Sequence, residues 1–121
     1  MQPPLIWADF NASGITKPAD EMTVVYLTKI GTIRDLKKQG LELTEGMPLR
    51  LYDNDLDKEG NEDNLVADGV AHFDEQAQRW TARVHVAGII HVSEAAQDPD
   101  HWASEIDWAA IRADQTDSKQ S

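Results

Sequence analysis

The chain has 121 residues, enough for one domain with a modest core, and its four Trp, two Tyr and two Phe supply large apolar side chains for that core. It contains no Cys, which excludes disulfides, cysteine nucleophiles and cysteine-ligated zinc sites. The formal net charge is −11, and residues 1–50 carry six acidic and six basic side chains, so the whole excess lies in residues 51–121. Such a surface repels nucleic-acid phosphates but could attract cations or a basic protein.

The start of the chain, MQPPLIWADF, has neither the basic region nor the apolar run of a secretory signal. No segment approaches the ~18 consecutive apolar residues of a membrane span. We therefore expect a soluble cytoplasmic protein with no membrane partner.

Strand signals dominate the first ninety or so residues. Short runs of apolar, aromatic and β-branched residues, separated by Gly, Pro, Asp and Asn, predict six strands, at 5–10, 22–30, 47–52, 65–75, 79–86 and 89–94. The segment NASGITKPADE, residues 11–21, reads as a loop between the first two strands.

The segment between the second and third strands fits two structures. Thr32 could cap a short helix that ends at Gly40. However, Leu41 and Leu43 alternate with polar residues, which is the period of a strand. We favour a hairpin, formed by 32–36 and 41–44, over the helix.

Several later residues indicate local features of the predicted strands. Pro48 lacks an N–H group and belongs at a strand start or on an edge. Gly69 indicates a bulge or bend in its strand. In the regular strand RWTARVHV, alternation places Trp80 on the inward face, where we expect it to be buried, and the AG pair at 87–88 allows a tight turn into the next strand.

The C-terminal part changes to a helical pattern. Asp98 is placed to cap a helix, Pro99 suits its first position, and Ser104 offers a second possible start. The residues that share one helical stripe are Trp102, Ile106, Ala109 and Ala113.

Together these elements predict a mainly β fold, a small antiparallel β-barrel with one C-terminal α-helix. An SH3-like barrel fits best and an OB-like barrel second. The barrel domain would span 1–97, the helix 98–113 would pack on it through Trp102 or Trp108, and the polar tail 114–121 would be disordered.

The stretch LTEGMPLRLYDNDLDKEGNEDNLVADGVAHFDEQAQRWTARV, within residues 41–94, resembles small bacterial proteins of no assigned role. In those proteins a GM strand leads into an acidic Asp/Gly/Asn loop, and a DxLxxxG strand and an RW strand follow. The resemblance implies a bacterial origin and a free-standing domain. It brings no activity, ligand or site residue with it.

The loop DNDLDKEGNEDNL, residues 53–65, holds six carboxylates and is the candidate metal site. An EF-hand register that starts at Asp55 has Gly60 at the required sixth position, but its twelfth position is Val66, which cannot coordinate calcium. Strands also flank the loop where an EF-hand has helices. We therefore expect a solvated connection between two strands that binds calcium weakly at most. The possible ligands are Asp53, Asp55, Asp57, Glu59 and Asp63.

Catalytic signals are missing from the sequence. His85 and His91 are expected on neighbouring strands, where they could approach each other, but no H-x-x-x-H or H-x-H spacing supports a metal site. No serine lies in a G-x-S-x-G elbow, and no phosphate-binding loop occurs. We expect a protein that is not an enzyme and that needs no cofactor other than, at most, weakly bound calcium.

The most consistent interpretation is a non-enzymatic acidic β-barrel that acts as a protein-interaction module. It would bind another protein through an exposed sheet edge, or bind a basic protein through its acidic half. One alternative is a calcium-binding domain that uses the loop 53–63. The other is a mimic of nucleic-acid phosphates that binds a basic protein. Direct binding of nucleic acid is not expected, and the sequence leaves the oligomeric state open.

Overall fold

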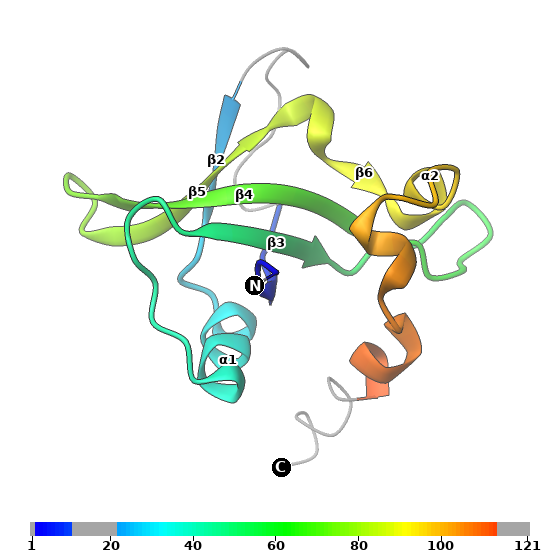
Figure 1. The fold of residues 1–121 in the computed structure, drawn as a ribbon, viewed down its shortest axis with the longest axis horizontal. Coiled ribbons are helices and arrows are strands. Elements are labelled where there is room, and N and C mark those ends of the chain that lie inside the picture. Colours follow the sequence, from blue (N-terminus) through cyan, green and yellow to red (C-terminus); the bar gives the residue numbers. More distant parts are fainter. Residues whose placement is uncertain (1, 11–21, 114–121) are drawn as a thin grey trace.

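The computed structural model describes residues 2–10 and 22–113. Within these residues the centre of the molecule is a six-stranded sheet with the order β1-β3-β4-β5-β2, in which β6 also pairs with β4 (Figure 1). The strands are β1 (Leu5–Trp7), β2 (Met22–Tyr26), β3 (Pro48–Asp53), β4 (Leu65–Asp74), β5 (Arg79–His85) and β6 (Ile90–His91). The loop 11–21 and the tail 114–121 lie outside the described residues.

The sheet is mixed and open. β1 runs parallel to β3, while every other strand pair is antiparallel. The sheet twists strongly, so that β2 crosses the direction of β3 (Figure 1). In the described part of the chain no pairing joins β1 to β2, so the sheet does not close into a barrel. The mainly β prediction is confirmed, but the sheet is neither closed nor wholly antiparallel.

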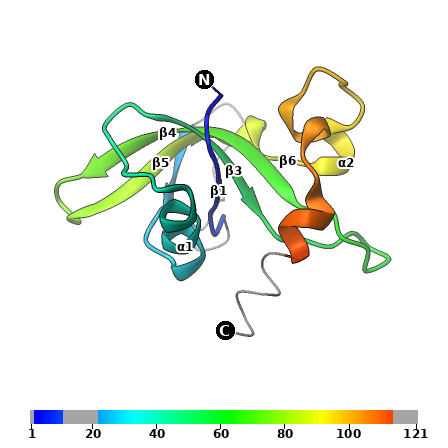
Figure 2. The same ribbon diagram turned by 60° about the horizontal axis from the view of Figure 1, so that its bottom comes forward.

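Strand alternation places apolar residues on both faces of the sheet. Leu51 faces the main core with Ile6 and Phe10, whereas its neighbour Tyr52 faces a second apolar cluster around Trp102. The second cluster lies beneath the C-terminal segment, which crosses that face of the sheet (Figure 2). A strand such as β3 is therefore apolar at successive positions because it is covered on both sides.

Three residues flagged by the sequence have specific roles in the sheet. Pro48 begins β3, as predicted. Trp80 is half-buried rather than buried, and it packs edge-on against Phe73 with ring centroids 5.3 Å apart. Gly69 forms no bulge, since it pairs with Leu49 in a continuous register. A Cβ at Gly69 would lie 2.9 Å from the Leu51 side chain, so the glycine permits close packing in the core.

The hairpin predicted for 32–44 is wrong, because this segment forms the helix α1 (Ile30–Gln39). Gly40 ends the helix in the left-handed conformation, with φ of 63°, and its N–H donates to the carbonyl groups of Leu36 and Lys37. The N-cap is Lys29 and not Thr32, which lies buried in the first turns. The glycine signal was therefore the correct one, and the alternation of Leu41 and Leu43 belongs to an extended loop.

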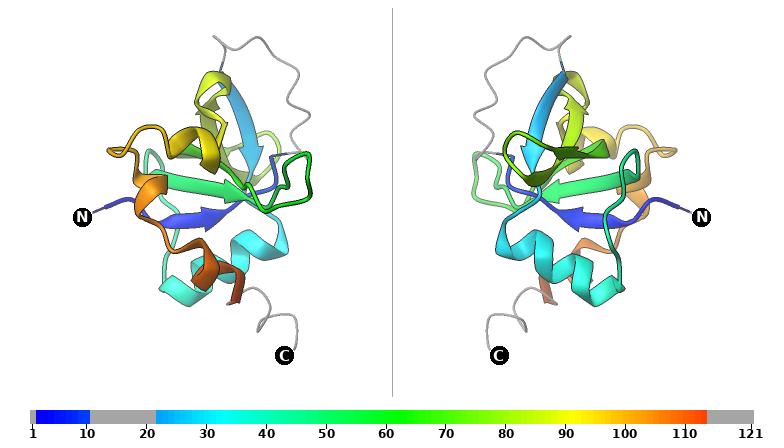
Figure 3. Two further views of the ribbon diagram at one scale, coloured as in Figure 1. Left: turned by 90° about the vertical axis from the view of Figure 1, so that its right-hand side faces the viewer. Right: turned by 90° about the vertical axis from the view of Figure 1, so that its left-hand side faces the viewer.

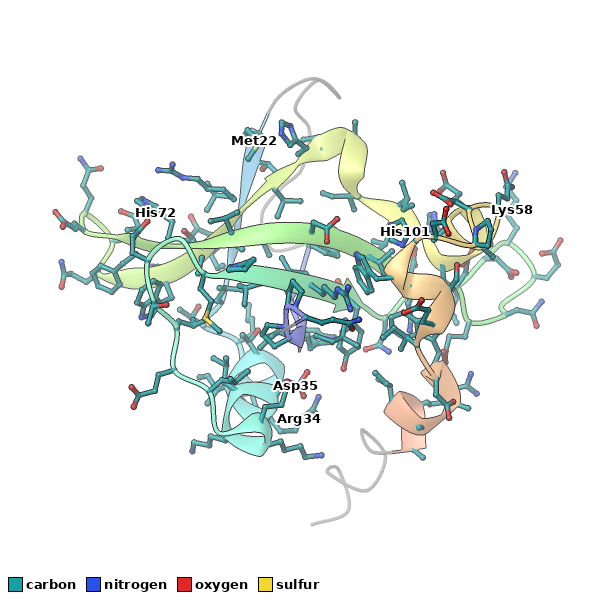
Figure 4. All side chains as sticks on the ribbon, viewed as in Figure 1. Met22, Arg34, Asp35, Lys58, His72 and His101 are labelled. Atoms are coloured by element: carbon teal, nitrogen blue, oxygen red, sulfur yellow. The ribbon has the colours of Figure 1, made fainter. Side chains whose placement is uncertain are left out.

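The helix α1 covers the outer edge of β1 with polar side chains. The Trp7 N–H donates to Asp35 Oδ2 over 2.9 Å, and the Thr32 hydroxyl donates to the Trp7 carbonyl over 2.7 Å. Gln39 Nε2 donates to the Leu5 carbonyl over 2.9 Å. Figure 4 shows Asp35 on the side of α1 nearest the sheet. The helix thus provides the hydrogen bonds that a further strand would otherwise make.

The C-terminal part contains short helical turns in place of a single helix over 98–113. β6 leads directly into α2 (Val92–Ala95), and a 3-10 turn, η3 (Trp102–Glu105), is followed by helical residues 108–113 (Figure 3). His101, rather than Asp98, caps η3 by accepting from the Ala103 N–H. Another 3-10 turn, η2 (Val86–Gly88), replaces the tight turn predicted at 87–88.

Packing through Trp102 and Trp108 is nevertheless as expected. Trp102 is buried and donates to Asp68 Oδ1 over 2.9 Å, while Trp108 packs edge-on against Tyr52 with ring centroids 5.6 Å apart. None of the helices in the described residues has the length and apolar character that a membrane crossing requires.

The cover of β1 predicts the effect of replacing Thr32 with valine. Thr32→Val keeps the side-chain shape but leaves the Trp7 carbonyl without its donor, which should lower the free energy of unfolding by about 1–3 kcal/mol. Thr28→Val, at an exposed position, is the matched control and should change it by less than about 0.5 kcal/mol. Urea unfolding measures both, and equal stability of the two variants would contradict the proposed role of the hydroxyl.

Candidate functional site

The acidic loop connects β3 to β4, as predicted, and it is an ordered hairpin. Leu56 and Glu62 form an isolated antiparallel bridge. The Asp63 N–H donates to the Asp55 carbonyl over 2.9 Å, and Gly60 turns the chain with φ of 84°. The backbone of the loop is therefore hydrogen-bonded to itself rather than arranged around an ion.

Asp53 is buried at the end of β3. Its carboxylate accepts from the N–H groups of Phe10, over 3.2 Å, and Asn54, over 2.8 Å. Burial raises the pKa of Asp53 to about 6, although these two N–H donors favour the charged form and oppose the shift. Asp53 thus joins the end of β3 to the segment after β1.

Two further candidate ligands lie at the tip of the loop. Asp57 Oδ1 accepts from the N–H groups of Glu59, over 3.0 Å, and Asn61, over 2.9 Å. This arrangement is the usual role of aspartate in a turn. Glu59 is exposed at the same turn.

The remaining two candidates connect the loop to α2. Asp55 Oδ2 lies 2.9 Å from Nε2 of His91, and Glu94 Oε1 lies 3.3 Å from Nδ1 of the same ring. Asp63 accepts from the Ser93 N–H over 2.9 Å and from the Ser93 hydroxyl over 2.6 Å. The loop is thereby fixed to the C-terminal segment at two points.

The five predicted ligands consequently do not meet at one point. Each accepts hydrogen bonds from a different donor or, in the case of Glu59, faces solvent. Among the described residues, no group of three or more His, Asp or Glu side chains is placed to hold a metal ion.

The contacts of His91 favour a charged imidazole ring. Hydrogen bonding to Asp55 raises the pKa of His91 above its ordinary value of 6.5, and the same contact lowers the pKa of Asp55 below 3.8. The pair therefore contributes its full stabilisation between about pH 3.8 and pH 6.5, where Asp55 is charged and His91 is protonated. Its contribution is lost as the pH rises through the raised pKa of His91, or falls through the lowered pKa of Asp55.

A nucleophilic site is not formed by these groups. The Ser93 hydroxyl donates to Asp63 and not to His91, so the serine–histidine contact of a catalytic triad is not formed here. His85 and His91 are not neighbours either, because β5 and β6 pair with successive parts of β4 rather than with each other. His72 instead lies 2.9 Å from Glu45 and 3.2 Å from Arg83.

The outer face of α1 is one of two surfaces among the described residues where large apolar side chains are exposed together; the other includes Met22 and Val70. Ile30 and Ile33 are 86% and 43% exposed, respectively. Together with Arg34, Lys37 and Lys38 they line a shallow hollow of about 340 Å³. Sequence reasoning missed this surface because it treated the segment as a hairpin. The spacing of the residues at 30, 33, 34 and 37 could have revealed it, since these positions share one helical face.

The inner face of α1 has the opposite character. Three polar side chains lie on this inner face and hydrogen-bond to the backbone of β1: Thr32, Asp35 and Gln39. An ordinary surface helix turns its apolar stripe toward the core and its polar stripe toward water. In α1 most of this arrangement is inverted, and Leu36 is the inner residue that packs against the core.

Comparison with protein-family models, with curated proteins and with solved structures gives no match to this chain. Its function must therefore be argued from its own residues.

The contact of His91 with the loop gives a prediction for nuclear magnetic resonance. In Asp55→Asn the neutral amide no longer stabilises the imidazolium, so the pKa of His91 should fall toward 6.5. Asp57→Asn removes an equal charge from the same loop but from a residue bonded to other groups, and it should change the titration of His91 much less. If the two variants shift the His91 titration equally, the general charge of the loop and not this contact governs the ring.

The separation of the loop carboxylates gives a prediction for calcium. Because they do not converge, we expect a dissociation constant of roughly millimolar or weaker, set by general attraction to the acidic loop. Calorimetric titration of chelator-treated protein measures it. A one-to-one site of micromolar affinity that Asp55→Ala abolishes would contradict this expectation.

Proposed function

We propose that this chain is a non-enzymatic protein-interaction module that binds another protein through the outer face of α1. The observation that supports the proposal is the inverted pattern of the helix, in which polar side chains face the sheet edge while Ile30 and Ile33 face solvent. Single exposed apolar residues are common on soluble proteins. Two on one helical face, next to a hollow, are typical of a surface that a partner covers.

The charges around these isoleucines favour an acidic partner. Lys37 is exposed on the same helical face, one turn after Ile33, and Lys29 directly precedes the helix. Arg34 shares this face, but its side chain is 25% exposed and pairs with Asp35 over 3.4 Å. These cations occur in a chain whose net charge is −11, so they mark a local reversal of sign. Complementary charges around an apolar contact increase the association rate and exclude partners of the wrong sign.

The interaction predicted from sequence used an exposed edge or the acidic half of the chain. β1 is unsuited to strand addition because α1 occupies its edge. A basic protein that binds the acidic half remains a prediction for that separate surface. The calcium-binding and phosphate-mimic alternatives lack a comparable observation, since the loop carboxylates accept hydrogen bonds from separate donors. The finer fold type, SH3-like ahead of OB-like, also stays a prediction.

Substitution of Ile30 tests the proposal. Ile30→Asp places a charge at the centre of the surface, where burial against a partner would be costly, so it should abolish a specific protein association. Because Ile30 is 86% exposed, the variant should unfold within about 0.5 kcal/mol of the parent chain. The measurement is co-purification of the tagged protein from its native host at moderate salt, followed by identification of the bound protein.

Leu56→Asp is the matched control. Leu56 is also a large exposed apolar residue, at 62%, but it lies in the acidic loop and away from α1. A protein that is retained by the parent chain and by Leu56→Asp, and lost with Ile30→Asp, supports the proposal. Retention of every bound protein by Ile30→Asp would show that this face is not the interface.

A further inference from the structure

The outer face of α1 changes character along the helix axis. Ile30 and Ile33 occupy the first turn, and the exposed cation Lys37 follows one turn after Ile33. Figure 4 shows Arg34 beside Asp35, and its Nη2 lies 3.4 Å from Asp35 Oδ1, so Lys37 is the more exposed cation on this face. A segment that covers this face must therefore offer apolar side chains at one end and carboxylates about one turn further on.

The backbone of α1 limits the kind of segment that can bind. An added β-strand needs unpaired N–H and C=O groups on its host. After the first turn of α1 these groups are hydrogen-bonded along the helix, and the carbonyls of Leu36 and Lys37 near its end accept from Gly40. The contact must then be made by side chains. Residues spaced three and four apart form ridges, into which the side chains of a second helix fit.

From these two observations we infer that the partner binds α1 through an acidic amphipathic helix. This inference rests on the proposed function and specifies the chemistry of the partner at the same site. Apolar side chains of that helix fill the hollow beside Ile30 and Ile33. Its carboxylates face Lys37.

Charge distinguishes this occupant from an anionic membrane, which would also suit apolar residues flanked by cations. The six carboxylates of the loop 53–65 and a net charge of −11 repel an anionic lipid surface as a whole. A single acidic helix is narrow enough to contact α1 without approaching the rest of this charge. The contact area of one short helix is small, so the isolated interaction is weak and transient.

Titration with designed peptides tests the inference. The probe is a synthetic helical peptide of about 16 residues, with Leu at positions i and i+3 and Glu at i+4, i+7 and i+8. The matched control peptide has Lys in place of each Glu. Each is added to ¹⁵N-labelled protein, and the amide chemical shifts report where and how tightly it binds. Vesicles containing phosphatidylglycerol form a third arm.

The expected result is binding of the acidic peptide with shifts centred on residues 29–39. Ile30→Asp should weaken that binding at least tenfold, Lys37→Glu about fivefold, and Leu56→Asp not at all. Equal binding of the basic peptide, or shifts centred elsewhere, would overturn the inference. Binding to vesicles without binding to the peptide would also overturn it, because the occupant would then be a membrane. Chemical shifts in α1 that change with protein concentration alone would overturn it too, because the occupant would then be a second copy of the chain.

The peptide titration and the co-purification distinguish a failure of this inference from a failure of the proposed function. If Ile30→Asp loses a native partner but the acidic peptide does not bind, the interface stands and the acidic helix is wrong. If the peptide binds α1 but Ile30→Asp retains every native partner, the proposed function is wrong.

Discussion

The structure depends on how the edge of β1 is satisfied. β1 is a short strand, paired on one side with β3, and without a cover its other side would present Trp7 and Leu5 backbone groups. α1 supplies a carboxylate, a hydroxyl and an amide to these groups. Gly31 allows the helix to come this close, because a Cβ there would lie 2.7 Å from the Trp7 ring. Ile6, which β1 carries into the main core, is held in place as a consequence.

The acidic half of the chain follows a related rule, in which carboxylates serve as acceptors for backbone and side-chain donors. Asp57 stabilises a turn, Asp63 holds the start of α2, and Asp55 binds His91. A high density of carboxylates does not by itself make a metal site, because each oxygen that accepts an N–H is directed toward that donor. The formal net charge of the chain is −11, which makes the cations near α1 a local reversal of sign.

Much of the sheet could be predicted from sequence, because alternation and turn residues are local signals. The β4–β5 hairpin and the start of β3 at Pro48 follow directly from them. The closure of the sheet, the parallel pairing of β1 and the position of β6 depend on contacts between distant segments, and no local pattern encodes these. The helix α1 was missed for a different reason. Its inward stripe is polar, so hydrophobic periodicity carries little signal, whereas the ending signal at Gly40 was present.

The candidate surface follows from the same constraint. A helix that satisfies a strand edge must turn polar side chains inward, which fixes Thr32, Asp35 and Gln39 on one face. The opposite face of the helix makes no contact with the strand, so polar residues there would be compatible with the fold. An exposed isoleucine at these positions is unfavourable, because its apolar surface contacts water and is not buried against another part of the chain. The proposed contact with a partner would account for Ile30 and Ile33 at these positions, and the adjacent Lys37 favours a partner of negative charge.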